Sequence, residues 1–567
     1  MAISGPPPPR TGGGREAVEL YTRTYRTVLR SSGALRLRVL ESAHKGVGSA
    51  LHPMAAEATV DSGAWLYALH RLPPVTLDLA RVVMGQSVGH LQAGLGVAME
   101  GWPAVQAPGR RRRWWWDQSS GTLAVALASS SDVDDLVPTL VALQLEWNKA
   151  HRILAGGGPP EPEAAREQMG FSEEDWVRLA ALFGDGFEAW LAQVARRPMD
   201  LGIQLLGGTQ VGYAQATRAW WAQIGATLER EGLVDRPLYF VSSNAHSLVN
   251  LVSGVARSRV GVLEAWVEAK GAPELRDALA ALRRPGARDS QENFLYYAAR
   301  RWFGAHPAAR AERDAEERAV GIRHLESASG TDVAAQIIDL RRLDWRRLDP
   351  RLGVAAGQAE RLARTDAVIL NIQYPLGLGA YHILRQVLEA SGRVAGVYIL
   401  GKAATLNADV GDVMIADVVH DEHSGNTYWL NNCFGFQEVA PFMAMGSVLD
   451  RQRAVTVLST FLQNHAYLEF YYRDAYTVVE MEAGPYLGAV FEAGDASRYP
   501  TGEHVDLTRP AVETGLIHYA SDTPYTQART LGARGLSYQG MDPTYAGGLA
   551  ITRRILQRAG VLDAQGG

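Results

Sequence analysis

The residues after about 330 alternate between short apolar runs and helix-like segments. Runs typical of β-strands occupy residues 337–340, 367–372, 394–400 and 413–419, and a helix-like segment covers residues 380–390. Strands that alternate with helices favour a mainly parallel sheet covered by helices. Ligands of such sheets bind at the carboxyl ends of the strands, so the loops that follow these runs are where we expect a site.

The preceding residues predict a different architecture. Residues 1–14 are rich in proline and glycine and read as a disordered tail. Residues 15–325 read as mostly helical, with Leu66, Leu69 and Leu72, then Leu79, Val82 and Val83, recurring at helix-like spacing. The fold class that follows is a large, mostly α-helical N-terminal region and an α/β domain over residues 326–567, in which a mixed sheet is covered by helices.

Two segments of the N-terminal region have a sharper pattern. Residues 132–154 predict a long helix that Asp132 or Asp134 caps. Residues 237–246 predict a short buried strand and a polar turn, with a helix from about Ser247. Such a turn can bind an anion through free backbone N–H groups, although ordinary helix capping is the commoner use of serine and asparagine there.

Composition excludes several classes of protein. The net charge of −5 and the pI near 6.3 lack the basic excess of a nucleic-acid-binding protein. The single cysteine, Cys433, rules out an intramolecular disulfide. No apolar run reaches the roughly 18 residues of a membrane span, and no signal-peptide pattern precedes residue 15. We therefore expect a cytoplasmic protein without nucleic-acid or membrane partners.

Four local features follow predicted strands of the α/β domain. Gly377 and Gly379 lie in a turn before a helix, where glycine permits positive φ and close backbone approach. Small residues that follow Leu400 leave room for a ligand; this turn contains Gly401, Lys402 and Ala403. Each feature is also typical of a tight turn or of close packing between strand and helix.

The other two features are acidic. Glu480 and Glu482 flank Met481 and project to the same side if this segment is extended, where carboxylates can accept hydrogen bonds from vicinal sugar hydroxyls. Acidic residues are also favourable at a helix N-terminus. Ser521 and Asp522 end an apolar run and, taken alone, are typical of a helix cap.

In this order and spacing, the four features resemble the nucleoside phosphorylase and nucleosidase superfamily, over about 40% of the chain. The resemblance implies that Met481 packs against a ribose and that Glu482 binds its 2′- and 3′-hydroxyls. It implies that Asp522 protonates, or hydrogen-bonds to, the departing purine. It places Glu480, Ser521 and the glycine-containing turns around the substrate, and it implies a homo-oligomer. The expected activity is cleavage of the N-glycosidic bond of a purine nucleoside or nucleotide.

The attacking group stays open at this point. Phosphorylases of this superfamily usually carry an arginine after a glycine in the first strand–loop, and no clear equivalent occurs near residues 337–347, although Arg341, Arg342, Arg346 and Arg347 are nearby. Water needs no anion pocket, which favours a hydrolase over a phosphorylase. A glycosyl transferase with another acceptor and a non-catalytic nucleoside-binding protein are the alternatives. We expect no cofactor and no metal.

Three further motifs have two interpretations each. The tripeptide at residues 421–423, Asp-Glu-His, is a candidate base-recognition loop and a weak metal motif. Tyr428, Trp429, Phe434 and Phe436 can stack on a base or form ordinary core. Arginines at 110–113 followed by tryptophans at 114–116 can bind phosphate and a base, although such a run is usually a solvated surface loop.

Overall fold

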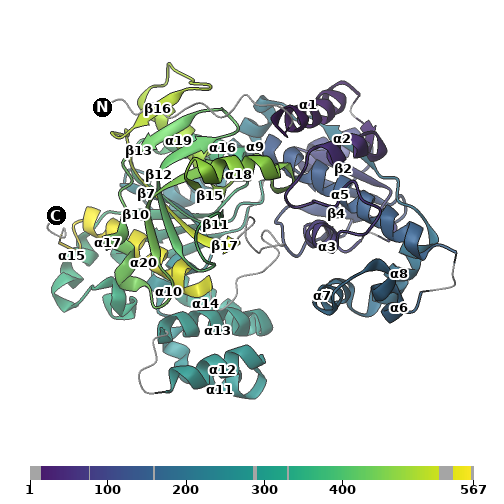
Figure 1. The fold of residues 1–567 in the computed structure, drawn as a ribbon. Coiled ribbons are helices and arrows are strands. Elements are labelled where there is room, and N and C mark those ends of the chain that lie inside the picture. The colour runs from purple at the N-terminus through teal and green to yellow at the C-terminus, as the bar shows by residue number, and fades with distance from the viewer. Residues whose placement is uncertain are drawn as a thin grey trace. The chain divides into compact units, whose positions relative to one another are not determined.

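The computed structural model describes residues 14–32, 34–75, 77–156, 160–284, 290–327, 331–522 and 540–563. The chain forms two compact units (Figure 1). Unit 1 comprises Met1–Gly208 and Leu458–Arg473, and unit 2 comprises Thr209–Val457 and Asp474–Gly567. This division differs from the boundary expected near residue 325. In the described part of the chain, no helix is long and apolar enough to cross a membrane.

Unit 1 contains a sheet that the helix-like sequence pattern did not predict. Its elements are α1 (Gly14–Ser32), β1 (Ala34–Arg36), α2 (Glu41–Gly46), α3 (Ser62–His70), β2 (Arg81–Gly85), α4 (Val88–Leu95), β3 (Ala104–Val105), β4 (Trp114–Asp117), β5 (Thr122–Ala126), α5 (Ser130–Leu154), α6 (Pro162–Met169), α7 (Glu173–Phe183), α8 (Phe187–Arg196), β6 (Gly202–Leu206) and α18 (His465–Arg473). The six strands pair in the order β1-β6-β2-β5-β4-β3. Strands β6, β2 and β5 are parallel, and both faces of such a sheet are buried.

The burial of β2 and β5 explains why the prediction of a mostly helical region was incomplete. Val82 and Val83 lie in β2, with exposures of 0%, rather than in the expected helix. A strand buried on both faces has no alternating pattern, so a short apolar run of this kind resembles a buried helix. The long helix was predicted correctly as α5, but its N-cap is Ser129, and Asp132 completes a capping box.

Unit 2 has the predicted α/β character. Its first half contains α9 (Gln210–Arg230), β7 (Leu238–Ser243), α10 (Ser247–Ser253), α11 (Val260–Lys270), α12 (Pro273–Leu282), α13 (Gln291–Ala305), α14 (Pro307–Ala319), β8 (Ile322–Leu325), β9 (Ala335–Asp339), α15 (Ala359–Arg364), β10 (Val368–Gln373) and α16 (Leu378–Ser391). Its second half contains β11 (Val394–Thr405), β12 (Val413–Asp421), β13 (Thr427–Leu430), α17 (Phe436–Val439), β14 (Val448–Thr456), β15 (Tyr476–Glu480), α19 (Ala483–Gly494), β16 (His504–Leu507), β17 (Glu513–Asp522) and α20 (Met541–Arg558).

The sheet of unit 2 is mixed and partly closed. Ten strands follow the order β16-β13-β12-β14-β15-β11-β7-β10-β9-β8, and β17 pairs with both β11 and β12. Strands β11, β17, β12, β14 and β15 therefore form a closed ring. Strands β7, β10, β11 and β17 are mutually parallel where they pair, as are β12, β14 and β15.

Helices cover both faces of this sheet, and each face has its own core. On one face, α9, α16 and α19 contribute Trp220, Ile383 and Leu487 to a cluster with alternate strand residues. On the other face, α10, α13 and α20 pack against the remaining strand residues. Adjacent residues of β7, such as Tyr239 and Phe240, belong to different clusters because strand side chains alternate between faces.

Candidate functional site

The ends of β11, β15 and β17 meet around Ala404. In β11, Ala404 pairs with Val479 of β15 on one side and with Asp522 of β17 on the other. Neighbouring strands are about 4.8 Å apart, so the segments that carry Glu482 and Asp522 flank β11 at a separation of about 10 Å. The structure thus brings together two acidic motifs that lie far apart in the sequence.

Strand β17 is irregular where it carries the Ser-Asp motif. The register shifts between Ala403 and Ala404 of β11, so that Ala520 pairs with the first and Asp522 with the second. Ser521 is the extra residue, and its Oγ donates to Asp522 Oδ2 at 2.7 Å and to the Ala403 carbonyl at 3.3 Å. Bulges re-aim side chains and are common beside active sites. Asp522 itself is buried, at 6% exposure.

The small-residue segment of β11 is strand rather than turn. We expected the strand to end at Leu400, but β11 continues to Thr405 because Gly401, Lys402 and Ala403 pair with His518, Tyr519 and Ala520. Gly401 and Lys402 are half-buried. A Cβ added at Gly401 would lie 3.6 Å from His518 Cδ2, an ordinary contact, so the room expected for a ligand there is taken by the His518 ring.

Glu480 does not extend toward a substrate beside Glu482. Its Oε2 accepts hydrogen bonds from the backbone N–H groups of Glu482 at 2.6 Å and Ala483 at 2.7 Å, and its Oε1 accepts from the Thr456 hydroxyl. The predicted same-side projection fails because β15 ends at Glu480 and the chain turns into α19. Glu480 therefore anchors the first turn of α19 and positions Met481 and Glu482, which are both half-buried.

The charge state of Glu480 is set mainly by burial. Burial raises the pKa of Glu480 to about 7, the hydrogen bonds from Thr456 and the two N–H groups oppose this rise, and nearby Asp421 adds to it. Asp421, Thr456 and Glu480 are directly paired at the ends of β12, β14 and β15, which explains their proximity. The result is a carboxyl group that titrates near neutral pH one residue away from Met481.

His518 is a neighbour of this carboxyl group that the sequence analysis passed over. Its Nε2 lies 3.9 Å from Glu480 Oε2, and its Nδ1 is buried with no hydrogen-bond partner in the described structure. Burial lowers the pKa of His518 to about 4, so the ring is neutral at pH 7. The signal in the sequence was a lone histidine within the apolar run of β17, which is typical of a core position as much as of a site.

The glycine-containing turn before α16 has the conformation that its composition predicts. Gly377 is the residue before α16, with φ 51° and ψ −123°, a combination that only glycine adopts without strain. Gly379 is buried in the first turn of α16. The assignment of Gly377 and Gly379 to the substrate remains a prediction.

The remaining motifs of unit 2 have structural roles. Asp421 accepts from His423 Nδ1 at 2.9 Å and from the Ser424 hydroxyl at 2.6 Å, and these bonds close a tight turn rather than a metal site. Tyr428 and Phe434 belong to the cores on opposite faces of the sheet, whereas Phe436 is exposed. The four aromatic residues therefore do not form one stacking face.

The arginine run of unit 1, which we considered as a phosphate site, also has structural contacts. Arg112 donates to Asp132 and Asp135 at 2.8 Å each, and Arg110 donates to Asp135 at 2.9 Å. Trp114 is fully buried in β4. Arg110 and Arg112 therefore anchor the N-terminal turn of α5, whereas Arg111 is exposed.

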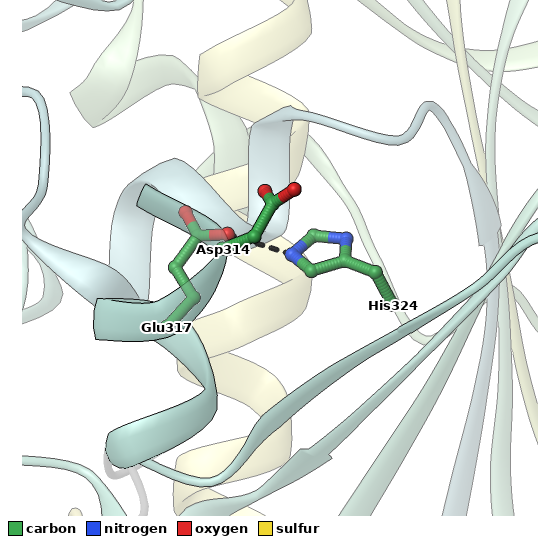
Figure 2. Close-up of side chains that lie close together, drawn as sticks. All are labelled: Asp314, Glu317 and His324. Carbon is green, nitrogen blue, oxygen red and sulfur yellow. Dashed lines mark hydrogen bonds and ion pairs between the residues drawn. The ribbon is translucent and has the colours of Figure 1, made fainter. Parts of the chain in front are cut away.

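One side-chain cluster of unit 2 has a metal-like composition. Asp314 and Glu317 of α14 and His324 of β8 offer ligand atoms within 4.8 Å of one another (Figure 2). His324 Nε2 lies 2.6 Å from Glu317 Oε2, and Gln336 Nε2 lies 3.3 Å from His324 Nδ1. An amide donor at Nδ1 leaves the ring proton on Nε2, where it is donated to Glu317.

Arg313 supplies the positive charge that this cluster needs. Its Nη2 lies 2.6 Å from Asp314 Oδ1, and its Nε lies 3.7 Å from Glu317 Oε2. Asp314 is therefore paired with the guanidinium, and Glu317 accepts a hydrogen bond from the His324 ring. This arrangement fits an ion-pair network better than a metal centre, in which Nε2 would have to give up its proton.

Comparisons with solved structures find nucleoside-cleaving enzymes at low similarity. An S-adenosylhomocysteine nucleosidase from Streptococcus pyogenes, in complex with 5-methylthiotubericidin, is 10% identical with a TM-score of 0.29, over 56% of this chain and 97% of that chain. A 5′-methylthioadenosine/S-adenosylhomocysteine nucleosidase from Neisseria meningitidis, in complex with methylthio-immucillin-A, is 11% identical with a TM-score of 0.26, over 42% and 89%.

A uridine phosphorylase from Schistosoma mansoni, in complex with thymine, is 12% identical with a TM-score of 0.26, over 44% of this chain and 84% of that chain. Likenesses at such low TM-scores carry no argument about function. No curated protein matches the sequence. A family model described as a family of unknown function (DUF6909) matches residues 37–557, which include parts of both units. The chain therefore belongs to the family of unknown function DUF6909.

Proposed function

We propose that unit 2 cleaves the N-glycosidic bond of a purine nucleoside or nucleotide. The observation that carries this proposal is the pairing of Ala404 with both Val479 and Asp522. Glu482 and Asp522 flank β11 as a result, about 10 Å apart by strand spacing. A nucleoside bound across β11 would meet Glu482 with its sugar hydroxyls and Asp522 with its base.

The two carboxyl groups have different tasks in this reaction. Glu482, at the N-cap of α19, accepts hydrogen bonds from the 2′- and 3′-hydroxyls and fixes the ribose against Met481. As the C1′–N bond breaks, its electron pair moves to the base, and the protonated carboxyl of Asp522 donates a proton to a ring nitrogen. Water adds its oxygen to C1′, and the proton that water loses restores the carboxyl group of Asp522.

The surroundings of both groups support such chemistry. Ser521 donates to Asp522 Oδ2 at 2.7 Å, which fixes the orientation of the carboxyl group. Glu480 holds the backbone of Glu482 at 2.6 Å and so fixes the start of α19. A reacting group must be held by rigid elements to act in a defined geometry, and both acids meet this requirement.

The direct test is release of free base from a panel of purine and pyrimidine nucleosides and their 5′-monophosphates, with and without inorganic phosphate. Chromatography separates the base from its substrate. We expect release from at least one purine compound, and a loss of about 10²–10⁴-fold in the Asp522→Asn variant, because a positioned general acid contributes that much.

Asp366→Asn is the matched control. Asp366 is exposed and precedes β10, at the opposite end of that strand from Gly377, so this variant is expected to keep wild-type activity. Equal activity of Asp522→Asn and wild type would remove Asp522 from the mechanism. Absence of base release from every compound would contradict the proposal and favour a nucleoside-binding protein or a transferase with another acceptor.

A further inference from the structure

Five buried ionisable side chains of unit 1 contact one another in a row, which we call the relay. They are Tyr21 of α1, His44 of α2, His52, and Glu146 and Lys149 of α5. The contacts along the row are Tyr21 Oη–His44 Nδ1 at 3.1 Å, His44 Nε2–His52 Nδ1 at 3.0 Å, His52 Nε2–Glu146 Oε1 at 2.7 Å and Glu146 Oε1–Lys149 Nζ at 2.6 Å. None of the five residues is more than 2% exposed, so each depends on its neighbours in place of water.

The contacts of Glu146 fix the direction of the hydrogen bonds at one end of the relay. Its Oε2 accepts from the Asp61 backbone N–H at 2.6 Å. Lys149 Nζ, which can only donate, also donates to the Met54 carbonyl at 2.7 Å. Donors therefore surround both oxygens of a carboxylate, and His52 Nε2 supplies the proton in its contact with Glu146.

The direction of the remaining bonds follows from the chemistry of a neutral imidazole, which has one N–H group and one acceptor nitrogen. Because His52 donates through Nε2, its Nδ1 accepts from His44 Nε2. His44 Nδ1 then accepts from the Tyr21 hydroxyl. Each of the three contacts between Tyr21 and Glu146 thus contains one proton, and neither ring has a nitrogen left to take another.

An additional proton disrupts this row wherever it binds. A protonated imidazole has two N–H groups and no acceptor. A proton on His52 therefore sets two N–H groups against each other, unless His44 donates through Nδ1 instead. In that case the Tyr21 hydroxyl loses its acceptor, and it has no other among the described residues. Either way a buried polar group loses its hydrogen bond, which is costly inside a protein.

The charges around the rings also oppose an additional proton. Burial is the main cause that lowers the pKa of His44 well below its usual value, and the neighbouring ring, Lys149 and Lys45 add to it. The nearby carboxylates are already occupied, because Glu146 is paired with Lys149 and Asp61 caps α3. No unpaired negative charge at the relay therefore compensates a protonated ring.

The relay is covered by a second segment of unit 1, Leu458–Arg473, which joins β14 to β15 in the chain. The Phe461 ring packs against both histidine rings of the relay, with centroids 6.0 and 6.1 Å away. Backbone hydrogen bonds join residues 48–50, next to His52, to residues 463–465. The loop that contains His52 thus holds this segment in unit 1.

We propose that the relay is an acid-sensitive latch: uptake of one proton by its two histidines releases residues 47–55 and, with them, the segment Leu458–Arg473 from the rest of unit 1. Released histidines return to water, where their pKa is about 6.5, so the released state binds protons more readily than the closed state. The stabilisation of the closed state is therefore complete above about pH 6.5 and is lost as the pH falls below that value.

Hydrogen–deuterium exchange of the full-length protein at pH 7.5, 6.5 and 5.5 tests the latch, with rates corrected for the intrinsic pH dependence of exchange. The opening constant of peptides that cover residues 47–55 and 458–464 is expected to rise about tenfold per pH unit below pH 6.5, because opening takes up one proton. Peptides of β5, which lies in unit 1 away from the relay, are expected to keep their protection.

The double variant His44→Gln, His52→Gln removes both titratable rings. A glutamine amide has a donor and an acceptor end, so it can continue the row of hydrogen bonds but cannot take up a proton near neutral pH. The rise in opening with acid is expected to disappear at both segments. His151→Gln is the matched control, because His151 of α5 contacts the Val194 carbonyl outside the relay, and this variant should retain the rise.

The wild-type titration decides the proposal even if the double variant does not fold. Protection of both segments that is equal at the three pH values would overturn the latch. Loss of protection throughout unit 1, with β5 included, would also overturn it, because unit 1 would then unfold as a whole. A folded double variant that keeps the wild-type pH dependence would assign the acid sensitivity to groups other than the two histidines and contradict the proposal.

Discussion

Unit 1 and unit 2 use buried charge in opposite ways. In unit 1, Arg110 and Arg112 are paired with Asp132 and Asp135 at the start of α5, and the charges of Arg110 and Arg112 outweigh burial to lower the pKa of Asp135 to about 2. In unit 2, Glu480 is buried, no cation among the described residues is paired with it, and burial raises its pKa to about 7. A fully paired charge holds a fold together, whereas a charge without an opposite partner can titrate or bind a ligand.

The largest expected effect on stability comes from removing the carboxylate that pairs with Arg110 and Arg112 in unit 1. Asp135→Asn leaves the buried guanidinium of Arg112 and the half-buried guanidinium of Arg110 without their shared carboxylate, so we expect a loss of about 3–5 kcal/mol in the free energy of unfolding. Hydrogen–deuterium exchange by mass spectrometry should locate the loss in unit 1. Asp200→Asn, at an exposed carboxylate 3.8 Å from Arg38, serves as the control with little effect. An unaltered unit 1 in Asp135→Asn would show that these pairs do not stabilise the fold.

The next effect concerns the pH dependence of the free energy of unfolding that Glu480 confers. Its pKa is about 7 in the folded protein and about 4.5 in the unfolded chain, so the folded state holds the proton more tightly. The stability that this group contributes is complete below about pH 4.5 and is lost as the pH rises to about 7, by about 3 kcal/mol in total.

Glu480→Gln should remove this change of stability with pH. The amide resembles the protonated acid, so the variant is expected to gain stability relative to wild type between pH 5 and pH 8, as measured by urea unfolding at each pH. Glu389→Gln, which alters an exposed glutamate of α16, should retain the wild-type slope. Parallel pH profiles for wild type and Glu480→Gln would show that Glu480 is ionised throughout.

A third effect tests whether Glu482 acts on the substrate. Glu482→Gln is expected to lower kcat/KM about a hundredfold, because hydrogen bonds from two sugar hydroxyls to a carboxylate lose their charge assistance. The 2′-deoxy form of the best substrate provides the cross-check, since it should lose less on going from wild type to the variant. Equal losses for both substrates would assign Glu482 a role other than binding the 2′-hydroxyl.

The smallest effect concerns an exposed arginine of α13, Arg300. Arg300 of α13 is exposed, so Arg300→Gln should change the free energy of unfolding by less than about 0.5 kcal/mol. Thermal unfolding of Arg300→Gln and Arg301→Gln, side by side, measures this. A large destabilisation by Arg300→Gln alone would make Arg300 a structural residue like Arg112.

Much of unit 2 was predictable because its signals are local. The apolar runs of β7, β10 and β12, and the helix α16, agree with the expected segments to within a few residues. Gly377 was singled out from its place between a predicted strand and a predicted helix, and its φ of 51° explains the choice of residue. Strand length, helix periodicity and glycine conformation depend on neighbours in the chain, which a sequence displays directly.

Other features depend on partners distant in the chain. The sheet of unit 1 was missed because a strand buried on both faces has no periodicity, and β11 was expected to end early because its pairing with β17 is invisible in a local pattern. The role of Glu480 changed from sugar ligand to helix anchor once Thr456 and the turn into α19 were located. The sequence analysis did not single out Arg300, because it lies within a segment with an ordinary helical pattern.

The sequence by itself determined the alternation of strands and helices in unit 2 and the identity of the acidic motifs that end two of its strands. Only the tertiary structure decided that Glu482 and Asp522 flank the same strand, and that Glu480 is buried. The physical reason is range: dihedral preferences and periodicity act over a few residues, whereas pKa values and charge balance depend on groups that folding brings together.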